Sequence, residues 1–128
     1  MRVLLDSHTL LWAVDAPVNL SPTALATLQD ASNDLLVSAA TLWEVAIKVS
    51  LGKLTLSQPY RTWMNQALTD LGASILPITV EYADAQAALP YHHRDPFDRL
   101  LVAQALVEGI PVVSVDSQLD LYGVNRLW

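Results

Sequence analysis

The sequence predicts an α/β fold, a sandwich with a mainly parallel sheet, in a single domain that spans residues 1–128. Short apolar segments alternate along the chain with segments of helical periodicity, which is the pattern of a parallel sheet covered by helices. Hydrophobic residues make up 52% of the chain and charged residues only 16%, so the sequence can fill a substantial core and lacks the composition of a disordered chain. No internal repeat, low-complexity segment or linker divides it.

The first third of the chain contains two of the expected strands. Residues 2–5 form an apolar run that ends in a carboxylate, Asp6, and residues 10–14 predict a short helix that stops before the next proline. A Ser-Pro dipeptide, which suits the cap and first position of a helix, begins a helix over residues 23–31. A second apolar run at residues 35–37 ends at a serine.

Two helices are expected in the middle of the chain. Residues 41–50 carry an apolar stripe at helical spacing, and a glycine soon follows them. Glu44 and Lys48 stand four residues apart on another face of this helix, a spacing at which opposite charges attract. A Ser-Gln-Pro segment then opens a helix that reaches Leu71 and is closed by Gly72.

The last part of the chain continues the alternation. A third strand is expected at residues 74–77, followed by a helix that starts at Thr79 and stops before the next proline. A long helix begins at Asp95–Pro96 and ends at a Glu-Gly pair. A fourth strand is expected at residues 111–115, and residues 124–128 predict a short edge strand.

The long helix is apolar around most of its circumference, so we expect it to pack on more than one side. Its start differs, because residues 92–98 are mostly polar or ionisable. Asp95 before Pro96 fits an N-cap followed by proline at the first helical position. Asp98, in the first turn, lies at the edge of a dry core, where it either helps to cap the helix or is aimed at a ligand.

Four carboxylates are expected at one edge of the predicted sheet. Asp6 and Asp116 directly follow strands, and Glu44 lies six residues beyond the end of another strand. Asp98 lies at the start of the helix that runs back towards the fourth strand. Because ligands of open parallel sheets bind outside the carboxyl ends of the strands, we expect these four side chains to converge.

Such a cluster of acids suits a hard divalent cation. Carboxylates raise one another's pKa unless a cation lies among them. Mg²⁺ binds through one or two carboxylates together with waters and substrate phosphates. The predicted chemistry is metal-assisted hydrolysis of a phosphodiester, in which the metal activates water and stabilises charge on the phosphate oxygens.

Each acid also has a purely structural explanation. Asp6 and Asp116 can cap the helices that follow them, and Asp95 is explained as a cap by the proline after it. Glu44 can form half of a surface ion pair with the lysine one turn further on. Asp98 can act in place of the usual glutamate of a capping box.

Other polar residues near these acids are candidate substrate contacts. Ser7 and Ser38, each just past a strand, offer hydroxyls that can orient water or donate to a phosphate, although both also fit ordinary turns. Arg94 and Arg99 flank the start of the acid-bearing helix and are candidate phosphate clamps. His8 either contacts substrate or serves as a polar residue at the start of its helix.

The remaining histidines and the tryptophans favour structural roles. His92 and His93 are adjacent and so face different ways, and no other pair of ligands has zinc spacing, so we expect them in a solvated loop. Trp12, Trp43 and Trp63 fall on apolar helix faces and are expected in the core, not as platforms for base stacking.

Composition narrows the class of protein further. The net charge of −6 argues against a domain that holds nucleic acid by bulk electrostatics, but not against an enzyme whose acids are neutralised by a metal. The chain has no cysteine, which excludes disulfides and zinc–thiolate sites. It lacks a membrane-spanning apolar run and a signal-peptide pattern, so a cytoplasmic protein with no membrane partner is expected. The low charged fraction, with many leucines and tryptophans, indicates that a partner covers apolar surface.

Four segments of the chain form a recognisable series of motifs: Leu4–His8, Ser38–Lys48, the quite specific His93–Ala105, and Val113–Asp116. They resemble the successive motifs of PIN domains, and most closely those of the VapC-type toxins of bacterial type II toxin–antitoxin modules, whose branch Gly52–Leu54 also matches. The resemblance extends over essentially the whole chain.

This resemblance implies a three-layer α/β/α fold around a parallel sheet and an endoribonuclease that depends on Mg²⁺ or Mn²⁺. By position, Asp6, Glu44, Asp98 and Asp116 correspond to the acidic quartet of the family, which implies catalytic and metal-binding roles, with Asp6 and Asp98 as the firmest ligands. Asp95 is an extra acid beside this quartet. The family also implies an RNA substrate, a homodimer and a small antitoxin as partners.

Two other hypotheses remain. A Mg²⁺-dependent phosphatase-like domain would use a strand-end aspartate as phosphoacceptor, but haloacid-dehalogenase-like enzymes have a second aspartate where His8 stands. Receiver domains have a lysine at a late strand end, and the chain has none. A non-catalytic binding module would instead use the acids to dock a basic peptide.

Overall fold

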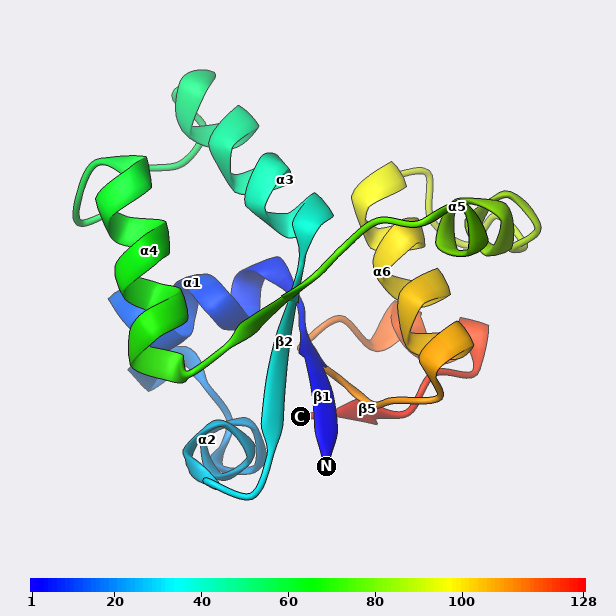
Figure 1. Cartoon of the computed structure of the whole chain (residues 1–128), viewed down its shortest axis with the longest axis horizontal. Helices are drawn as coiled ribbons and strands as arrows, with labels where there is room; N and C mark the ends of the chain where they lie inside the picture. The colour runs from blue at the N-terminus through cyan, green and yellow to red at the C-terminus, as the bar shows by residue number, and fades with distance from the viewer.

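The computed structural model describes all 128 residues, and a five-stranded, fully parallel sheet lies at its centre (Figure 1). The strand order is β3-β2-β1-β4-β5, so the chain adds β2 and β3 on one side of β1 and then β4 and β5 on the other. Ligands of such sheets bind at the carboxyl ends of the strands, where the order reverses. The strands are β1 (Arg2–Leu5), β2 (Asp34–Ser38), β3 (Ser74–Leu76), β4 (Val112–Val113) and β5 (Arg126–Leu127).

Six α-helices and two 3-10 helices connect the strands. Most α-helices begin at a side chain that accepts a hydrogen bond from a backbone N–H of the first turn, as their sequences predict. Gly72 and Gly109 end two of them in the left-handed conformation that glycine adopts without strain. The helices are α1 (Ser7–Asp15), η1 (Pro17–Asn19), α2 (Pro22–Gln29), α3 (Ala39–Ser50), α4 (Tyr60–Leu71), α5 (Val80–Ala87), α6 (Pro96–Glu108) and η2 (Ser117–Tyr122).

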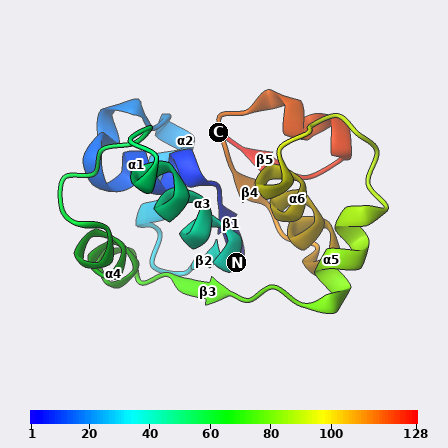
Figure 2. The same ribbon diagram turned by 90° about the horizontal axis from the view of Figure 1, so that it is seen from above.

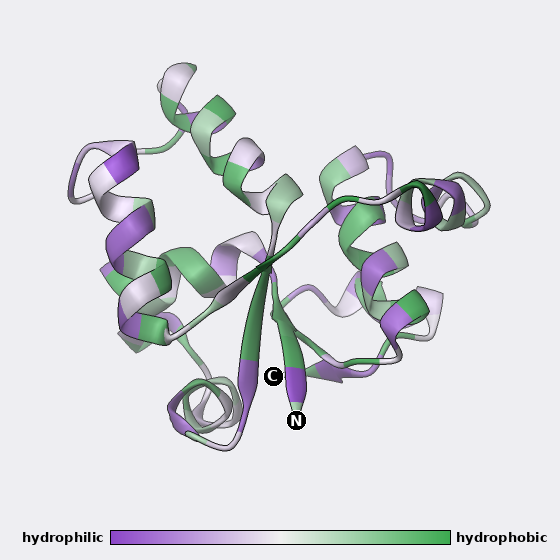
Figure 3. Cartoon of the chain, viewed as in Figure 1, coloured by the Kyte–Doolittle hydropathy of each residue, from purple (hydrophilic) through white to green (hydrophobic).

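Helices cover both faces of the sheet (Figures 1 and 2), which confirms the three-layer α/β/α fold. Successive residues of a strand point to opposite faces, so Val3 and Leu5 join the core under α1 to α4, whereas Leu4 joins the core under α5 and α6. All three of these side chains are fully buried. Figure 3 shows β1 and β2 hydrophobic along most of their length, as expected for strands buried on both faces.

The elements differ from the sequence predictions mainly at their ends. Helix α1 starts at Ser7, three residues earlier than expected, because the Asp6 side chain caps it. Strand β4 ends at Val113, two residues early, because the chain turns there to bring Ser114 and Asp116 to the end of the sheet. The 3-10 helix η2 was not predicted. None of the helices has the length and apolar character needed to cross a bilayer.

The three tryptophans assigned to the core do not share one environment. Trp63 of α4 is buried as predicted, with 1% of its surface exposed. The prediction is wrong for Trp43 of α3, which is 65% exposed; its ring lies edge-to-face with that of Phe97 of α6, with 5.9 Å between the ring centroids. Trp12 of α1 is half-buried and lines a cavity.

Candidate metal centre

One cavity of about 280 Å³ opens at the carboxyl ends of β1 and β4 and receives all four acids of the predicted quartet. Residues from α1, α3, α6 and the segment after β4 line it, which are elements far apart in the sequence. We call it the metal cavity. The side chains that line it are Asp6, Ser7, His8, Trp12, Glu44, Lys48, Asp95, Asp98, Ser114, Val115, Asp116 and Leu119.

Asp6 is held by hydrogen bonds on both carboxylate oxygens. Its Oδ1 accepts from the backbone N–H of Thr9 at 2.8 Å, which caps α1, and its Oδ2 accepts from the hydroxyl of Ser114. Thr9 in turn donates through Oγ1 to the carbonyl of Val113 at 2.8 Å, so the start of α1 is tied to β4. Asp6 therefore caps a helix and lines the cavity at once, and its carboxylate is fixed in orientation.

Glu44 is a buried acid of the second turn of α3, with 5% of its surface exposed. Its Oε2 accepts from the Lys48 ammonium at 2.8 Å, so the predicted pair exists but is more than a surface contact. Burial lowers the pKa of Lys48, but the hydrogen bond with Glu44 and the negative charges of Glu44, Asp95 and Asp98 outweigh it and raise that pKa above its usual value. Lys48 therefore stays charged and balances part of the cavity's negative charge.

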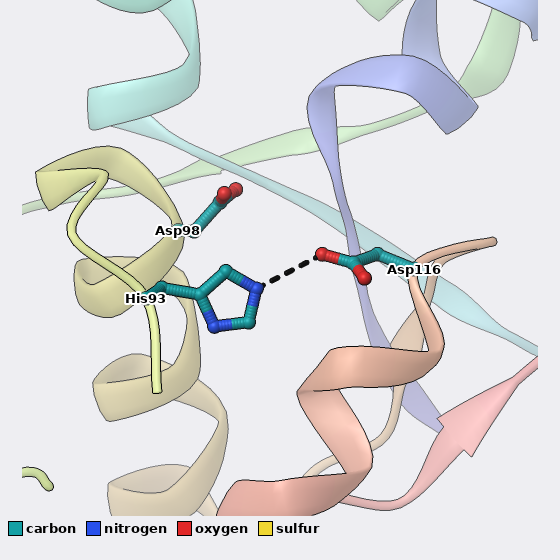
Figure 4. Close-up of side chains that lie close together, drawn as sticks. All are labelled: His93, Asp98 and Asp116. Atoms are coloured by element: carbon teal, nitrogen blue, oxygen red, sulfur yellow. Dashed lines mark hydrogen bonds and ion pairs between the residues drawn. The ribbon is translucent and has the colours of Figure 1, made fainter. Parts of the chain in front are cut away.

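Asp98, in the first turn of α6, lines the metal cavity with the other acids and lies near His93 and Asp116 (Figure 4). Burial first, and then the negative charges of Asp95 and Glu44, raise the pKa of Asp98 from 3.8 to about 6. Burial disfavours the charged form of a carboxylate, and neighbouring negative charges add to that effect. The N-cap of α6 is Asp95, whose Oδ1 accepts from the backbone N–H of Phe97 at 2.8 Å, so Asp98 is free of capping.

His93 lies in the candidate site, and the prediction of a solvated loop is wrong for it. Only 8% of its side chain is exposed, and its Nε2 lies 3.1 Å from Oδ2 of Asp116 (Figure 4). Its backbone N–H donates to the Tyr122 hydroxyl at 2.8 Å, and its ring stacks on that of Tyr122. One ligand atom each from His93, Asp98 and Asp116 lie within 4.8 Å of one another.

Asp116 and Ser114 together form the part of the site that follows β4. The Asp116 Oδ1 accepts from the backbone N–H of Gln118 at 3.0 Å and so caps η2, while its other oxygen faces His93. Ser114 is fully buried, donates to Asp6 and accepts from the backbone N–H of Asp116 at 3.1 Å. A single hydroxyl therefore sets the spacing of two acids that are 110 residues apart in the sequence.

Only some of the candidate substrate contacts lie near the acids in the structure. Ser7 lines the metal cavity and Arg94 is exposed on a neighbouring cavity that also contains Glu44 and Asp95. Ser38 does not line the cavity, because its Oγ accepts from the backbone N–H of Ala40 at 3.1 Å and caps α3.

Arg99 is not a phosphate clamp, and this prediction is wrong. Its side chain points away from the metal cavity and is 2% exposed. The guanidinium donates to the carbonyls of Pro90, Gln86 and Leu89 at 2.9, 2.9 and 3.1 Å and lies over the ring of Tyr91. It therefore anchors the end of α5 and the segment that leads to His93.

The structure adds two residues that sequence reasoning missed. The sequence places His93 in a solvated loop because adjacent histidines face apart, but only one of the pair needs to face the acids. Ser114 lies two residues before Asp116 at the end of a strand, so its side chain leaves the strand on the same side. That alternation was the available signal for Ser114, whereas nothing local pointed to His93.

Comparison with known proteins identifies the family of the chain. The chain matches the PIN domain family over residues 3–125. It is 32% identical over 118 residues to Ribonuclease VapC22 of Mycobacterium tuberculosis, an alignment that covers 91% of this chain and 88% of that protein.

Solved structures with the same fold come from toxin–antitoxin complexes. VapBC2 from Rickettsia felis, bound to a DNA fragment from its promoter, superimposes with a TM-score of 0.75 at 12% identity over 98% of this chain and 97% of that one. VapBC-5 from Mycobacterium tuberculosis superimposes with a TM-score of 0.63 at 17% identity over 98% and 96%. At these identities the structures show the fold, while the family match and the 32% identity show descent. The chain belongs to the PIN-domain family, in the branch that contains the VapC ribonucleases.

Proposed function

We propose that this protein is a metal-dependent endoribonuclease and the toxin of a toxin–antitoxin module. The observation that carries the proposal is the convergence of Asp6, Glu44, Asp98 and Asp116 on one cavity. These acids come from four separate elements, so helix capping alone does not explain why they meet. The relative VapC22 is named a ribonuclease, which supports RNA as the substrate.

The side chains of the metal cavity fit a hard divalent cation. Carboxylate oxygens are ligands that both Mg²⁺ and Mn²⁺ prefer. Burial and then the charges of Asp95 and Glu44 raise the pKa of Asp98, and a cation among these acids would offset the second of these causes. We propose that Asp6 and Asp98 are the principal ligands of Mg²⁺ or Mn²⁺, with Glu44 and Asp116 completing the site.

The chain's own residues then have distinct tasks in hydrolysis. When bound, a divalent cation supplies positive charge against the phosphate oxygens and Lewis acidity towards water. Ser114 and the backbone of Thr9 hold the Asp6 carboxylate in one orientation, and Lys48 does the same for Glu44. Ser7 offers a hydroxyl in the cavity wall for a phosphate oxygen. Fixed groups of this kind lower the reorganisation that the reaction requires.

A cleavage assay tests this proposal. Mixed RNA is incubated with the wild type in Mg²⁺, in Mn²⁺ and in chelator, and with Asp6→Asn, Asp98→Asn and the control Asp84→Asn, whose acid is exposed on α5. We expect cleavage only with the cation, a loss of about a hundredfold or more in the first two variants, and none in the control. An Asp6→Asn protein with a native circular dichroism spectrum and wild-type cleavage would refute it.

We also propose two protein partners and a place of action. An antitoxin is supported by the solved VapBC structures, which have the same fold. A second copy of the chain is supported by an apolar patch beside the metal cavity, formed by the exposed Trp43 and Leu51 and the half-buried Phe97. Trp43→Asp should then shift the protein from dimer to monomer in light scattering, and an unchanged mass would reject this interface. RNA as substrate is consistent with action in the cytoplasm.

A further inference from the structure

A second cavity, of about 370 Å³, adjoins the metal cavity along α1 and the segment that follows α3. The two cavities share three lining residues, His8, Trp12 and Lys48. A ligand that fills one therefore touches the wall of the other. We call the second one the side cavity.

The side cavity is aromatic and apolar on one wall. Trp12 is half-buried, and its ring centroid lies 5.6 Å from that of His8 and 5.9 Å from that of Trp128. Leu11 and Leu54 continue the apolar wall. Single-stranded nucleic acids bind to such surfaces because each base has a flat face that stacks on an aromatic ring.

A hydrogen-bond network at the protein surface holds the segment that follows α3 against α1. Asp15, at the end of α1, accepts from the backbone N–H of Ser57 at 3.1 Å, from the Ser57 hydroxyl at 2.6 Å and from the indole N–H of Trp63 at 3.1 Å. Trp63 is part of the hydrophobic core. These contacts tie the segment that carries Lys53 and Leu54 to α1, so the side cavity is preformed.

One cation of the side cavity is available to an anionic ligand. Lys48 and Lys53 both line it, but Lys48 is paired with Glu44, which leaves Lys53 without an ion-pair partner. Asp15, the acid of this cavity, accepts hydrogen bonds from Ser57 and Trp63. Several of the other basic residues are engaged elsewhere: Arg2 pairs with Glu108, Arg126 with Asp120, and Arg99 is buried.

We propose that the side cavity binds a base of the RNA, namely that of a nucleotide flanking the phosphate at the metal centre, with Trp12 as the stacking surface and Lys53 against the backbone. The inference rests on the proposed ribonuclease function and adds to it where the substrate lies. The base must be unpaired to reach the cavity, so the substrate is single-stranded at this point. Stacking with few polar contacts tolerates any base.

Binding of two matched oligomers tests the inference. The probes are a uridine dodecamer and an abasic ribose-phosphate dodecamer of equal charge. Affinities are measured in Mg²⁺ in the Asp6→Asn background, so that the RNA stays intact. Trp12→Leu keeps an apolar side chain without a ring, and Trp12→Phe keeps a ring. We expect Trp12→Leu to weaken uridine binding about tenfold, Trp12→Phe to weaken it less, and neither to change abasic binding.

A second comparison tests whether a lysine in the side cavity contributes more to RNA binding than a cation elsewhere on the surface. Lys53→Ala should weaken both dodecamers about threefold, whereas Arg61→Ala, which removes an exposed cation of α4 outside the cavity, should not. Equal losses for the uridine and abasic oligomers in Trp12→Leu would overturn the stacking inference. So would an unchanged RNA affinity together with loss of the antitoxin complex, which would assign the cavity to a protein.

Cleavage kinetics distinguish failure of the side-cavity inference from failure of the proposed ribonuclease function. If the wild type with an intact Asp6 does not cleave RNA in Mg²⁺ or Mn²⁺, the ribonuclease proposal fails. If it cleaves RNA and Trp12→Leu keeps the wild-type KM and kcat, only the side-cavity inference fails. A raised KM with an unchanged kcat in Trp12→Leu supports both.

Discussion

The carboxylate of Asp98 lies beside other acids, and this proximity lowers the stability of the folded protein when no cation is bound. Burial and then the charges of Asp95 and Glu44 raise the pKa of Asp98 from 3.8 to about 6. Because the folded-state pKa is the higher one, the stability that protonation of Asp98 adds is complete below about pH 3.8. It is lost as the pH rises through 6.

Asp98→Asn should therefore stabilise the protein in chelator at neutral pH. We expect a gain of about 1 to 2 kcal/mol in the free energy of unfolding at pH 8, after allowing for solvent screening, that shrinks towards zero near pH 4. Urea unfolding at both pH values measures it. Asp84→Asn, at an exposed acid, provides the control and should not change with pH in this way. A destabilised Asp98→Asn at pH 8 would contradict the electrostatic account.

Ser114→Ala should impair the site more than it impairs the fold. It leaves Asp6 Oδ2 and the N–H of Asp116 without their partner, at about 1–3 kcal/mol of stability. We expect a 10- to 100-fold loss of metal affinity, the usual effect of removing a group that orients a ligand. Ser38→Ala is the matched control, since this buried serine caps α3 outside the cavity. Equal metal affinity in the two variants would mean that Ser114 does not position the acids.

The sequence predicted the positions of the four acids but not the side chains that hold these acids in place. Asp6 and Asp116 could be predicted because Asp6 directly follows β1 and Asp116 lies shortly after β4, and the carboxyl ends of parallel strands meet at one edge of the sheet. His93 could not, because its position depends on Tyr122 and Asp116, which follow it by 29 and 23 residues. The prediction for Arg99 was wrong for the same reason. An arginine next to a candidate catalytic acid suggests a substrate contact, and the carbonyls that accept its hydrogen bonds can be identified only from the structure.

At the scale of elements, two neighbouring residues of helix α6 have different roles, one in the metal cavity and one in packing. Asp98 faces the metal cavity, whereas Arg99 turns inward and donates to three carbonyls at the end of α5 and in the segment after it. The same segment continues to His93, whose backbone N–H donates to Tyr122. Arg99 therefore couples the packing of α5 against α6 to the position of His93.

Replacing Arg99 by methionine tests this coupling. Arg99→Met should lower the free energy of unfolding by about 2–4 kcal/mol, because buried carbonyls lose their donors. Hydrogen exchange at the amide of His93 should speed up, since its loop is no longer anchored. Arg99→Lys, which keeps the charge but not the three bonds, should fall between. Wild-type exchange at His93 in a destabilised Arg99→Met would separate the loop from the anchor.

The strands and helices were predictable in type and less so in extent. Alternating apolar segments and cap-proline or glycine signals located nearly every element, because both faces of this sheet are buried and each helix has a conspicuous start or stop. The end of β4 and the helix η2 were not predicted, since the turn at Ser114 depends on a hydrogen bond to Asp6, which is far away in the sequence. Trp43 escaped because an apolar stripe does not reveal which side of a helix the sheet will cover.

For the whole molecule, RNA binding has to overcome a net charge of −6. The basic side chains next to the two cavities are few: Lys48, Lys53 and Arg94. The affinity of Asp6→Asn for the uridine dodecamer in Mg²⁺ should therefore depend only weakly on salt. Three phosphate contacts predict a slope of about −2 in a plot of log K against log salt. A slope steeper than about −4 would require cations from elsewhere, such as a second copy of the chain.

The central claim is that side chains from four elements share one divalent cation. The most direct test is anomalous scattering from a crystal soaked in Mn²⁺, with a crystal of Asp98→Asn as the control. The account predicts an anomalous peak within coordination distance of Asp6 and Asp98 in the wild type and a weakened or absent peak in the variant. A wild-type crystal with no peak in the metal cavity, or with its peak out of reach of both aspartates, would contradict it.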